Sequence, residues 1–156
     1  MTWQEVLDDK SLSDLPYKIE LNKEGCIVMS PASNRHARFQ ANIAGRLYRL
    51  NKNGVVLTEC SVETEDNVKV PDVAWASESF LKKNGDVTPF KNAPDICVEV
   101  YSPSNTEASM RRKRELYFQK GAKEVWICDK DGALTFYDVK SELPKSKLFP
   151  RFPKTI

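Results

Sequence analysis

One short stretch restricts the fold more than any other part of the sequence. Residues 96–101, Ile-Cys-Val-Glu-Val-Tyr, follow Pro94 and run into the helix-breaking sequence Ser-Pro-Ser-Asn. Such a run of apolar and β-branched residues is typical of a strand buried on both faces. Glu99 nevertheless lies in its middle, and a carboxylate is seldom buried without a partner. We therefore expect a covered sheet with a cation or a shared proton close to Glu99.

Period and turn signals predict further strands and two helices around this stretch. Strands are expected at residues 19–22, 26–29, 55–60, 68–75, 96–101, 124–129 and 134–139, and helices at residues 35–50 and 107–120. A Ser or Asn from the Ser-Pro-Ser-Asn sequence is expected to cap the second helix, and Gly121 to end it. This order predicts an α/β fold that has a mixed central sheet, flanking helices and an N-terminal hairpin.

The length of 156 residues suits one domain. We predict a single domain over residues 1–156, with a core of about residues 19–138. Residues 139–156 lack a clear period and are expected to form a C-terminal arm or loop. The chain has no membrane-length apolar run and no signal-peptide pattern at its start, so we expect a cytoplasmic protein without a membrane partner.

The cysteines and the single histidine argue against several kinds of site. Cys26, Cys60, Cys97 and Cys128 are widely spaced and form no Cys-x-x-Cys pair, so buried free thiols are expected. His36 is the only histidine. A zinc site of Cys and His ligands, or a Ser-His-Asp or Cys-His arrangement, would have to include that one residue.

Two carboxylates are candidates for a shared site. Side chains two positions apart in a strand share a face, which places Asp95, Glu99 and Tyr101 together and Asp72 beside Ala74. If the two strands are neighbours, Asp72 and Glu99 meet, and a divalent metal with oxygen ligands would suit them. The alternative is that each acid lies at a strand end or faces water and pairs with an arginine. For Asp95, at the mouth of its strand, we expect solvation or a strand-end hydrogen bond.

Two residues on the expected helices point inward. Lys113 falls in the same arc as Met110 and Leu116, so its ammonium needs an anionic partner, such as a metal-bound carboxylate or a substrate phosphate. The alternative is a lysine whose stem covers apolar surface. His36 lies in the apolar stripe of the first helix, with Gln40 at its edge. A lone histidine on such a face is more often a hydrogen-bonded core residue than a ligand or base.

Basic residues are concentrated in two segments although the net charge is only +2. They could contact a polyanion, or they could be solvated helix faces. The two sets are Arg35, Arg38, Arg46, Arg49 and Lys52, and Arg111, Arg112, Lys113, Arg114, Lys120 and Lys123.

Five motifs together resemble a known family. They read IVMSPASNRH, VPDVAW, PDICVEVYSPSN, KRELY and GAKEVWICD, and they lie within residues 19–138. Their order and content resemble the bacterial family described as putative restriction endonucleases, within the PD-(D/E)XK nuclease superfamily. The resemblance implies a restriction-endonuclease-like core and Mg²⁺- or Mn²⁺-dependent hydrolysis of phosphodiester bonds.

The resemblance also implies roles for individual residues. Asp72 and Glu99 take the places of the two metal-binding acids, and the residue after the second acid, Val100, would lend its backbone carbonyl to the metal. The motif lysine would follow two positions after Glu99, where this chain has Tyr101. Lys113, on the following helix, would then take the role of that lysine.

Accessory roles and partners follow from the same resemblance. The accessory candidates are His36, Gln40, Tyr101 and Tyr117, and the candidates for contacts to a nucleic-acid backbone are Arg35, Arg38, Arg111, Arg112 and Arg114. DNA is the expected partner and RNA stays open, while a homodimer would suit two-fold cleavage of a duplex.

Two other hypotheses remain open at this point. Because Tyr101 replaces the motif lysine, the chain could be a catalytically inactive nuclease fold that binds nucleic acid or a protein. It could also be an unrelated structural α/β protein, in which case Asp72 and Glu99 would lie on opposite faces of the sheet.

Overall fold

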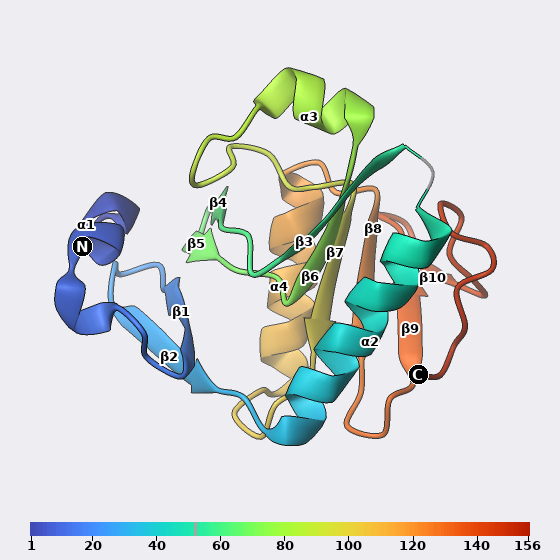
Figure 1. Ribbon diagram of the computed structural model, residues 1–156, viewed down its shortest axis with the longest axis horizontal. Coiled ribbons are helices and arrows are strands. Elements are labelled where there is room, and N and C mark those ends of the chain that lie inside the picture. Colours follow the sequence, from blue (N-terminus) through green and yellow to red (C-terminus); the bar gives the residue numbers. More distant parts are fainter. Residues whose placement is uncertain (52) are drawn as a thin grey trace.

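The computed structural model describes residues 1–51 and 53–156; Lys52, which belongs to the first basic segment, lies outside the described residues. A six-stranded mixed sheet forms its centre (Figure 1). The strands are β3 (Gly54–Thr58), β6 (Val73–Ser77), β7 (Ile96–Val100), β8 (Glu124–Cys128), β9 (Leu134–Tyr137) and β10 (Glu142–Leu143). Their order is β10-β9-β8-β7-β6-β3, and only the β7–β8 pair runs parallel.

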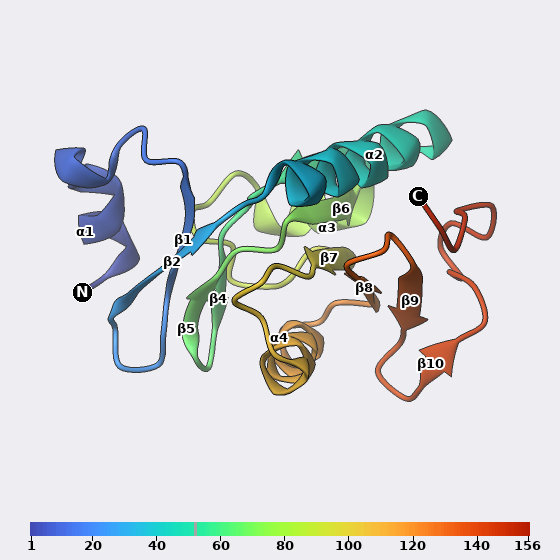
Figure 2. The same ribbon diagram turned by 90° about the horizontal axis from the view of Figure 1, so that it is seen from below.

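Two helices cover the opposite faces of this sheet. Figure 2 shows α2 (Asn34–Leu50) on one side and α4 (Glu107–Gln119) on the other. Side chains of β7 alternate between the two faces of the sheet. Val98 packs in the hydrophobic core that includes residues of α2, and Cys97 packs in the one that includes a residue of α4. The predicted α/β fold with a mixed sheet and flanking helices is confirmed.

The helix ends follow the local sequence. The Ser33 hydroxyl accepts the His36 N–H and so begins α2. The cap of α4 is Thr106, whose hydroxyl accepts the N–H of Ser109, so the predicted Ser or Asn cap is wrong. Asn105 is occupied elsewhere, because its side chain accepts the Ser102 N–H in the preceding turn.

The N-terminal part lies beside the sheet. It comprises α1 (Trp3–Asp8), a 3-10 turn (Lys10–Leu12), and the antiparallel hairpin of β1 (Tyr17–Leu21) and β2 (Ile27–Pro31). The predicted hairpin is therefore present. Lys69 ties it to the rest of the molecule, because its ammonium donates to the Leu21 carbonyl at 2.8 Å.

The region before β7 contains more elements than the sequence predicts. The single strand expected at residues 68–75 is wrong: β5 (Asn67–Lys69) pairs with β4 (Val62–Thr64) in a hairpin, and β6 starts only at Val73. Pro71, which has no N–H to give to a ladder, lies in the break. A short helix, α3 (Glu78–Asn84), also lies in the connection between β6 and β7, where no helix was predicted.

The structure tests the predictions made for the cysteines and for a membrane-spanning segment. All four cysteines are free; Cys97 and Cys128 are buried and Cys60 is partly buried. Cys26 is exposed, so the prediction of a buried thiol is wrong there, because it lies beside the turn of the first hairpin. Within residues 1–51 and 53–156, no helix has the length and apolar character needed to cross a membrane.

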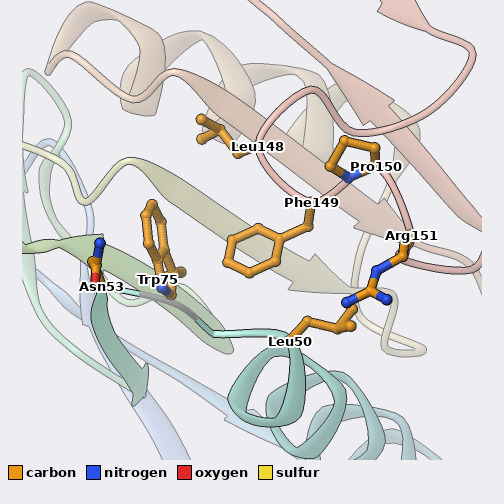
Figure 3. A pocket seen from close by; sticks show the side chains of 7 residues that line it. All are labelled: Leu50, Asn53, Trp75, Leu148, Phe149, Pro150 and Arg151. Atoms are coloured by element: carbon orange, nitrogen blue, oxygen red, sulfur yellow. The ribbon is translucent and has the colours of Figure 1, made fainter.

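The C-terminal segment, predicted to be an arm or loop, is mostly a loop that packs against the sheet and adds the short strand β10. Phe149 and Phe152 are buried. The Phe149 ring packs edge to face against the Trp75 ring, with 5.0 Å between the ring centroids (Figure 3). The centroids of the Phe152 and Trp126 rings lie 4.7 Å apart. Most of the segment has an irregular backbone, so aromatic packing rather than a periodic pattern holds it, which is why its sequence gave no sign of a regular element.

We expect Phe149→Ala to lower the free energy of unfolding by about 3–5 kcal/mol, because it removes a buried ring and leaves a cavity. Urea unfolding followed by circular dichroism measures the change. Val139→Ala is the control, since Val139 is 71% exposed and should change stability by less than about 0.5 kcal/mol. Equal effects of the two substitutions would show that the segment is not part of the core.

Candidate functional site

The antiparallel pairing of β6 and β7 brings two acids together. Val73 lies opposite Val98, and the Asp72 N–H donates to the Val98 carbonyl at 2.9 Å. Asp72 therefore lies next to Glu99, and each residue is only 1% exposed. Both carboxylates contact the same ammonium group, so the two acids meet in one cluster at the ends of these strands. Acids that meet in this way do not favour the hypothesis of an unrelated structural protein, for which they should lie apart on opposite faces.

The shared ammonium belongs to Lys18 of β1. Its Nζ lies 2.8 Å from Asp72 Oδ1 and 3.3 Å from Glu99 Oε2. The sequence analysis missed Lys18, since the expected strand began one residue later. The signal was the alternation Lys-Ile-Glu-Leu at residues 18–21, which places Lys18 and Glu20 on one face of a strand.

Lys113 of α4 provides a second ammonium on the other side of Glu99. Its Nζ lies 3.2 Å from each Glu99 oxygen and 2.8 Å from Glu20 Oε1. The same Glu20 oxygen accepts the Val70 N–H at 2.8 Å. Because the Lys113 side chain is only 11% exposed and bonds two buried carboxylates, it is not a lysine that merely covers apolar surface. The inward direction predicted from the helical arc is confirmed.

Three further groups fix the two acids. The Tyr117 hydroxyl donates to Glu99 Oε1 at 2.6 Å, and the Val100 N–H donates to Asp72 Oδ2 at 2.7 Å. His36 is buried, with its Nε2 3.3 Å from the same Asp72 oxygen. Its Nδ1 has no hydrogen-bond partner among the described residues. His36 and Tyr117 therefore lie at the site, as proposed for accessory residues, whereas the metal-binding role of the Val100 carbonyl stays a prediction.

Burial and neighbouring charges pull the pKa values of the acids in opposite directions. Burial opposes ionisation of Asp72, but the Lys18 ammonium and the His36 hydrogen bond hold its pKa well below the usual range. Complete burial raises the pKa of Glu99, even though Lys113 and Lys18 act against the shift. Despite burial, the pKa of Glu20 is lowered by Lys113 and Lys18.

Burial and the neighbouring carboxylates also shift the pKa values of Lys18 and Tyr117. The pKa of Lys18 is raised: burial disfavours its charge, but Glu99 and Asp72 together outweigh that effect. Burial first, and then the negative charge of Glu99, raise the pKa of the Tyr117 phenol far above its ordinary value. Tyr117 is thus a hydrogen-bond donor to Glu99 throughout the physiological pH range.

A cavity of about 450 Å³ gives access to this ion cluster. Asp72, Lys18 and Lys113 line it, and the β1–β2 hairpin forms one wall. Gln40 also lines it, donating to Glu59 across 3.4 Å, which places this accessory candidate at the cavity rather than on the acids.

Tyr101 lies apart from the acids. It lines a neighbouring cavity of about 670 Å³, which shares His36 with the first and also includes Arg35 and Lys130. It also borders a third cavity beside Arg111. Among the described residues, the Tyr101 hydroxyl forms no hydrogen bond with Asp72 or Glu99, whereas the Lys113 ammonium bonds Glu99.

The arginines proposed for backbone contacts differ in how free they are. Arg112 forms a bidentate ion pair with Asp66, and the Arg114 guanidinium lies 3.8 Å above the Tyr137 ring. Arg38 is exposed beside the Phe39 ring. Arg35 donates only a long hydrogen bond, 3.4 Å, to the Lys130 carbonyl. The best placed of the five are Arg35 and Arg111, which line cavities next to the site.

The donor set suits a hard divalent cation. Carboxylate oxygens are the ligands that Mg²⁺ and Mn²⁺ prefer, and the Lys18 ammonium marks a position within reach of both Asp72 and Glu99. Among residues 1–51 and 53–156, no three Asp, Glu, His or Cys side chains form a complete ligand set. Water and phosphate oxygens would have to supply the remaining ligands, as is common for Mg²⁺.

Asp95 has the role expected at a strand end. It accepts the Ser77 N–H at 2.7 Å and pairs with Lys123 at 2.8 Å. These partners hold it away from the cluster of Asp72 and Glu99, and the hydrogen-bonded alternative of its prediction is confirmed.

Comparison with known proteins agrees with the resemblance found in the motifs. Residues 8–145 match the model of the Uma2 family, described as putative restriction endonuclease. A crystal structure of a putative nuclease belonging to DUF820 from Anabaena variabilis ATCC 29413 aligns with a TM-score of 0.74 and 17% identity, over 99% of this chain and 94% of that one. At this identity the likeness concerns the fold alone. No curated protein matches the chain.

The lowered pKa of Glu20 predicts a pH dependence of stability. Its ionised form stabilises the fold above a pH of about 4.3, the pKa of an unfolded glutamate. This stabilisation is lost as the pH falls through the lower native pKa. We expect Glu20→Gln to be less stable than the wild type at neutral pH and to lose less free energy of unfolding on acidification.

Urea unfolding from about pH 6 to about pH 2 measures this difference. Glu24→Gln is the control, because Glu24 is exposed in the turn of the same hairpin. It should follow the wild-type profile. Parallel profiles for Glu20→Gln and the wild type would contradict the ionic role of Glu20.

Proposed function

We propose, from the premise that this chain belongs to the Uma2 family of putative restriction endonucleases, that it is a metal-dependent nuclease that hydrolyses phosphodiester bonds in DNA. One observation supports the proposal most: Asp72 and Glu99 are buried side by side against one cation, beneath a cavity that Asp72 and Lys113 line. Buried acids of this kind are costly for stability, so their presence favours a functional role.

Asp72 and Glu99 would hold the metal, Mg²⁺ or Mn²⁺, through their carboxylate oxygens, and the Val100 carbonyl is the further candidate ligand. When bound, the metal would polarise the scissile phosphate and lower the pKa of a water molecule. Tyr117 and His36 keep the two carboxylates in place through their hydrogen bonds. An acid that cannot rotate holds its ligand with less loss of entropy.

Lys113 would act on the substrate. Its ammonium lies against Glu99 and lines the cavity, so a phosphate entering there would meet a positive charge. That charge would stabilise the negative charge that develops as the phosphodiester is attacked. Lys113 thus fills the role that the family motif assigns to the residue two positions after the second acid.

DNA is the substrate that we propose. Arg35 and Arg111, beside the site, would contact the phosphate backbone without reading the sequence, which makes binding sensitive to salt. Cleavage of both strands by a homodimer, in the cytoplasm, would fit this role and rests on analogy.

A second candidate function is a module that binds nucleic acid or a protein without cleaving. The position of Tyr101 favours it, since no lysine follows two positions after Glu99 and Tyr101 faces a separate cavity. Calorimetric titration separates the two functions. A nuclease should bind Mn²⁺ through Asp72 and Glu99, whereas a binding module should show no metal site that depends on them.

We expect Asp72→Ala and Glu99→Ala each to lower the rate of Mg²⁺-dependent DNA cleavage about 100-fold or more, since each removes a proposed metal ligand. Nicking of a supercoiled plasmid by the purified variants measures this rate. Glu78→Ala is the matched control, because Glu78 is an exposed carboxylate that pairs with Lys82 on its own helix. Equal residual cleavage in all the variants would point to a contaminating nuclease and contradict the proposal.

A further inference from the structure

The position of Lys18 is not explained by the proposed roles of the other residues. Its ammonium lies between Asp72 and Glu99, at 2.8 and 3.3 Å, and its side chain is 13% exposed. A metal that used these two carboxylates would need the space and the oxygen lone pairs that Lys18 now occupies. The ammonium and the metal therefore compete for the same ligands.

The charges of the cluster support this competition. Without a metal, the carboxylates of Asp72, Glu99 and Glu20 face the ammonium groups of Lys18 and Lys113. With all five groups ionised, the cluster carries one net negative charge. An empty pair of buried carboxylates would repel strongly, and Lys18 removes that cost. A divalent ion would turn the net charge positive by one, which a single phosphodiester group would neutralise.

The way Lys18 is attached allows it to leave. It comes from the β1–β2 hairpin, which lies beside the central sheet, and its ammonium reaches the acids at the end of a flexible four-carbon stem. It also lines the cavity through which a phosphate would enter. Rotation of the stem, without a change of backbone, would open the position between the acids. Lys113 differs, because Glu20 holds it from the other side at 2.8 Å.

We propose that Lys18 is an internal counter-ion that occupies the cation position of Asp72 and Glu99 until a divalent metal displaces it. This inference rests on the proposed function in assigning those acids to a metal. Lys18 lowers the affinity for free metal and keeps the buried acids stable without it. Once displaced, its ammonium remains in the cavity, which Glu20 and Glu59 also line, and there it can meet an entering phosphate.

The test is the affinity of Lys18→Gln for Mn²⁺, measured by isothermal titration calorimetry on the full chain. Because a positive charge next to the metal is removed, the dissociation constant should fall about tenfold or more relative to the wild type. Lys69→Gln is the matched control: Lys69 ties the same hairpin to the Leu21 carbonyl and does not touch the two acids. Its dissociation constant should change far less.

The outcomes separate this inference from the proposed function. Binding of Mn²⁺ to both proteins with equal affinity, abolished in each by Asp72→Ala, would overturn the counter-ion role and leave the nuclease proposal intact. Weaker binding by Lys18→Gln would also overturn it, since Lys18 would then support the site. Absence of Mn²⁺ binding in both proteins would overturn the counter-ion role and the proposed metal site together.

A second measurement uses the wild-type protein and does not depend on the folding of a variant. Lysine acetylation by a small amine-reactive reagent is followed by mass spectrometry of the Lys18 peptide, with and without Mg²⁺. Displacement should increase the modification of Lys18 several-fold and leave that of Lys69 unchanged. Unchanged or reduced modification of Lys18 at saturating Mg²⁺ would overturn the proposal.

Discussion

The buried cluster of three carboxylates and two ammonium groups is the interaction on which the rest of this structure depends. Asp72, Glu99 and Glu20 could not stay ionised in the core without Lys18 and Lys113. The cluster explains why elements distant in sequence converge. Lys18 lies 54 residues before Asp72 and 81 before Glu99. Its ion pairs hold the N-terminal hairpin against the sheet, while Lys113 holds α4 from the other side.

The cluster also links folding to the proposed chemistry. The two buried carboxylates are held in place by Tyr117, His36 and the Val100 N–H, so they are oriented to bind a cation. Their buried negative charges would destabilise the fold if no cation lay beside them. Lys18 resolves the conflict by supplying a removable charge. In this account, the stability of the protein without metal and its affinity for metal oppose each other through one side chain.

Much of the fold and part of the site could be predicted from local sequence patterns. The alternation of residues 96–101 and the proximity of two strands predicted the meeting of Asp72 and Glu99, and the helical arc predicted the direction of Lys113. Lys18 and Glu20 could not be placed in this way, because strand alternation gives a face but not the distant partner it covers. For the same reason the packing of the C-terminal segment could not be predicted, since aromatic contacts such as Phe149 with Trp75 have no period.

Tyr101 shows that a residue at a motif position in the sequence need not lie at the corresponding place in the structure. It stands two positions after Glu99, where the resemblance to the nuclease superfamily implies a lysine, yet it borders other cavities, and Lys113 reaches Glu99 from α4. The most direct test of the account is a crystal structure of the protein soaked in Mn²⁺, with anomalous diffraction to locate the metal. Metal density is expected within oxygen-ligand distance of Asp72 and Glu99, with the Lys18 ammonium moved into the cavity. Lys18 still bridging the two acids at saturating Mn²⁺, with no metal density beside them, would contradict it.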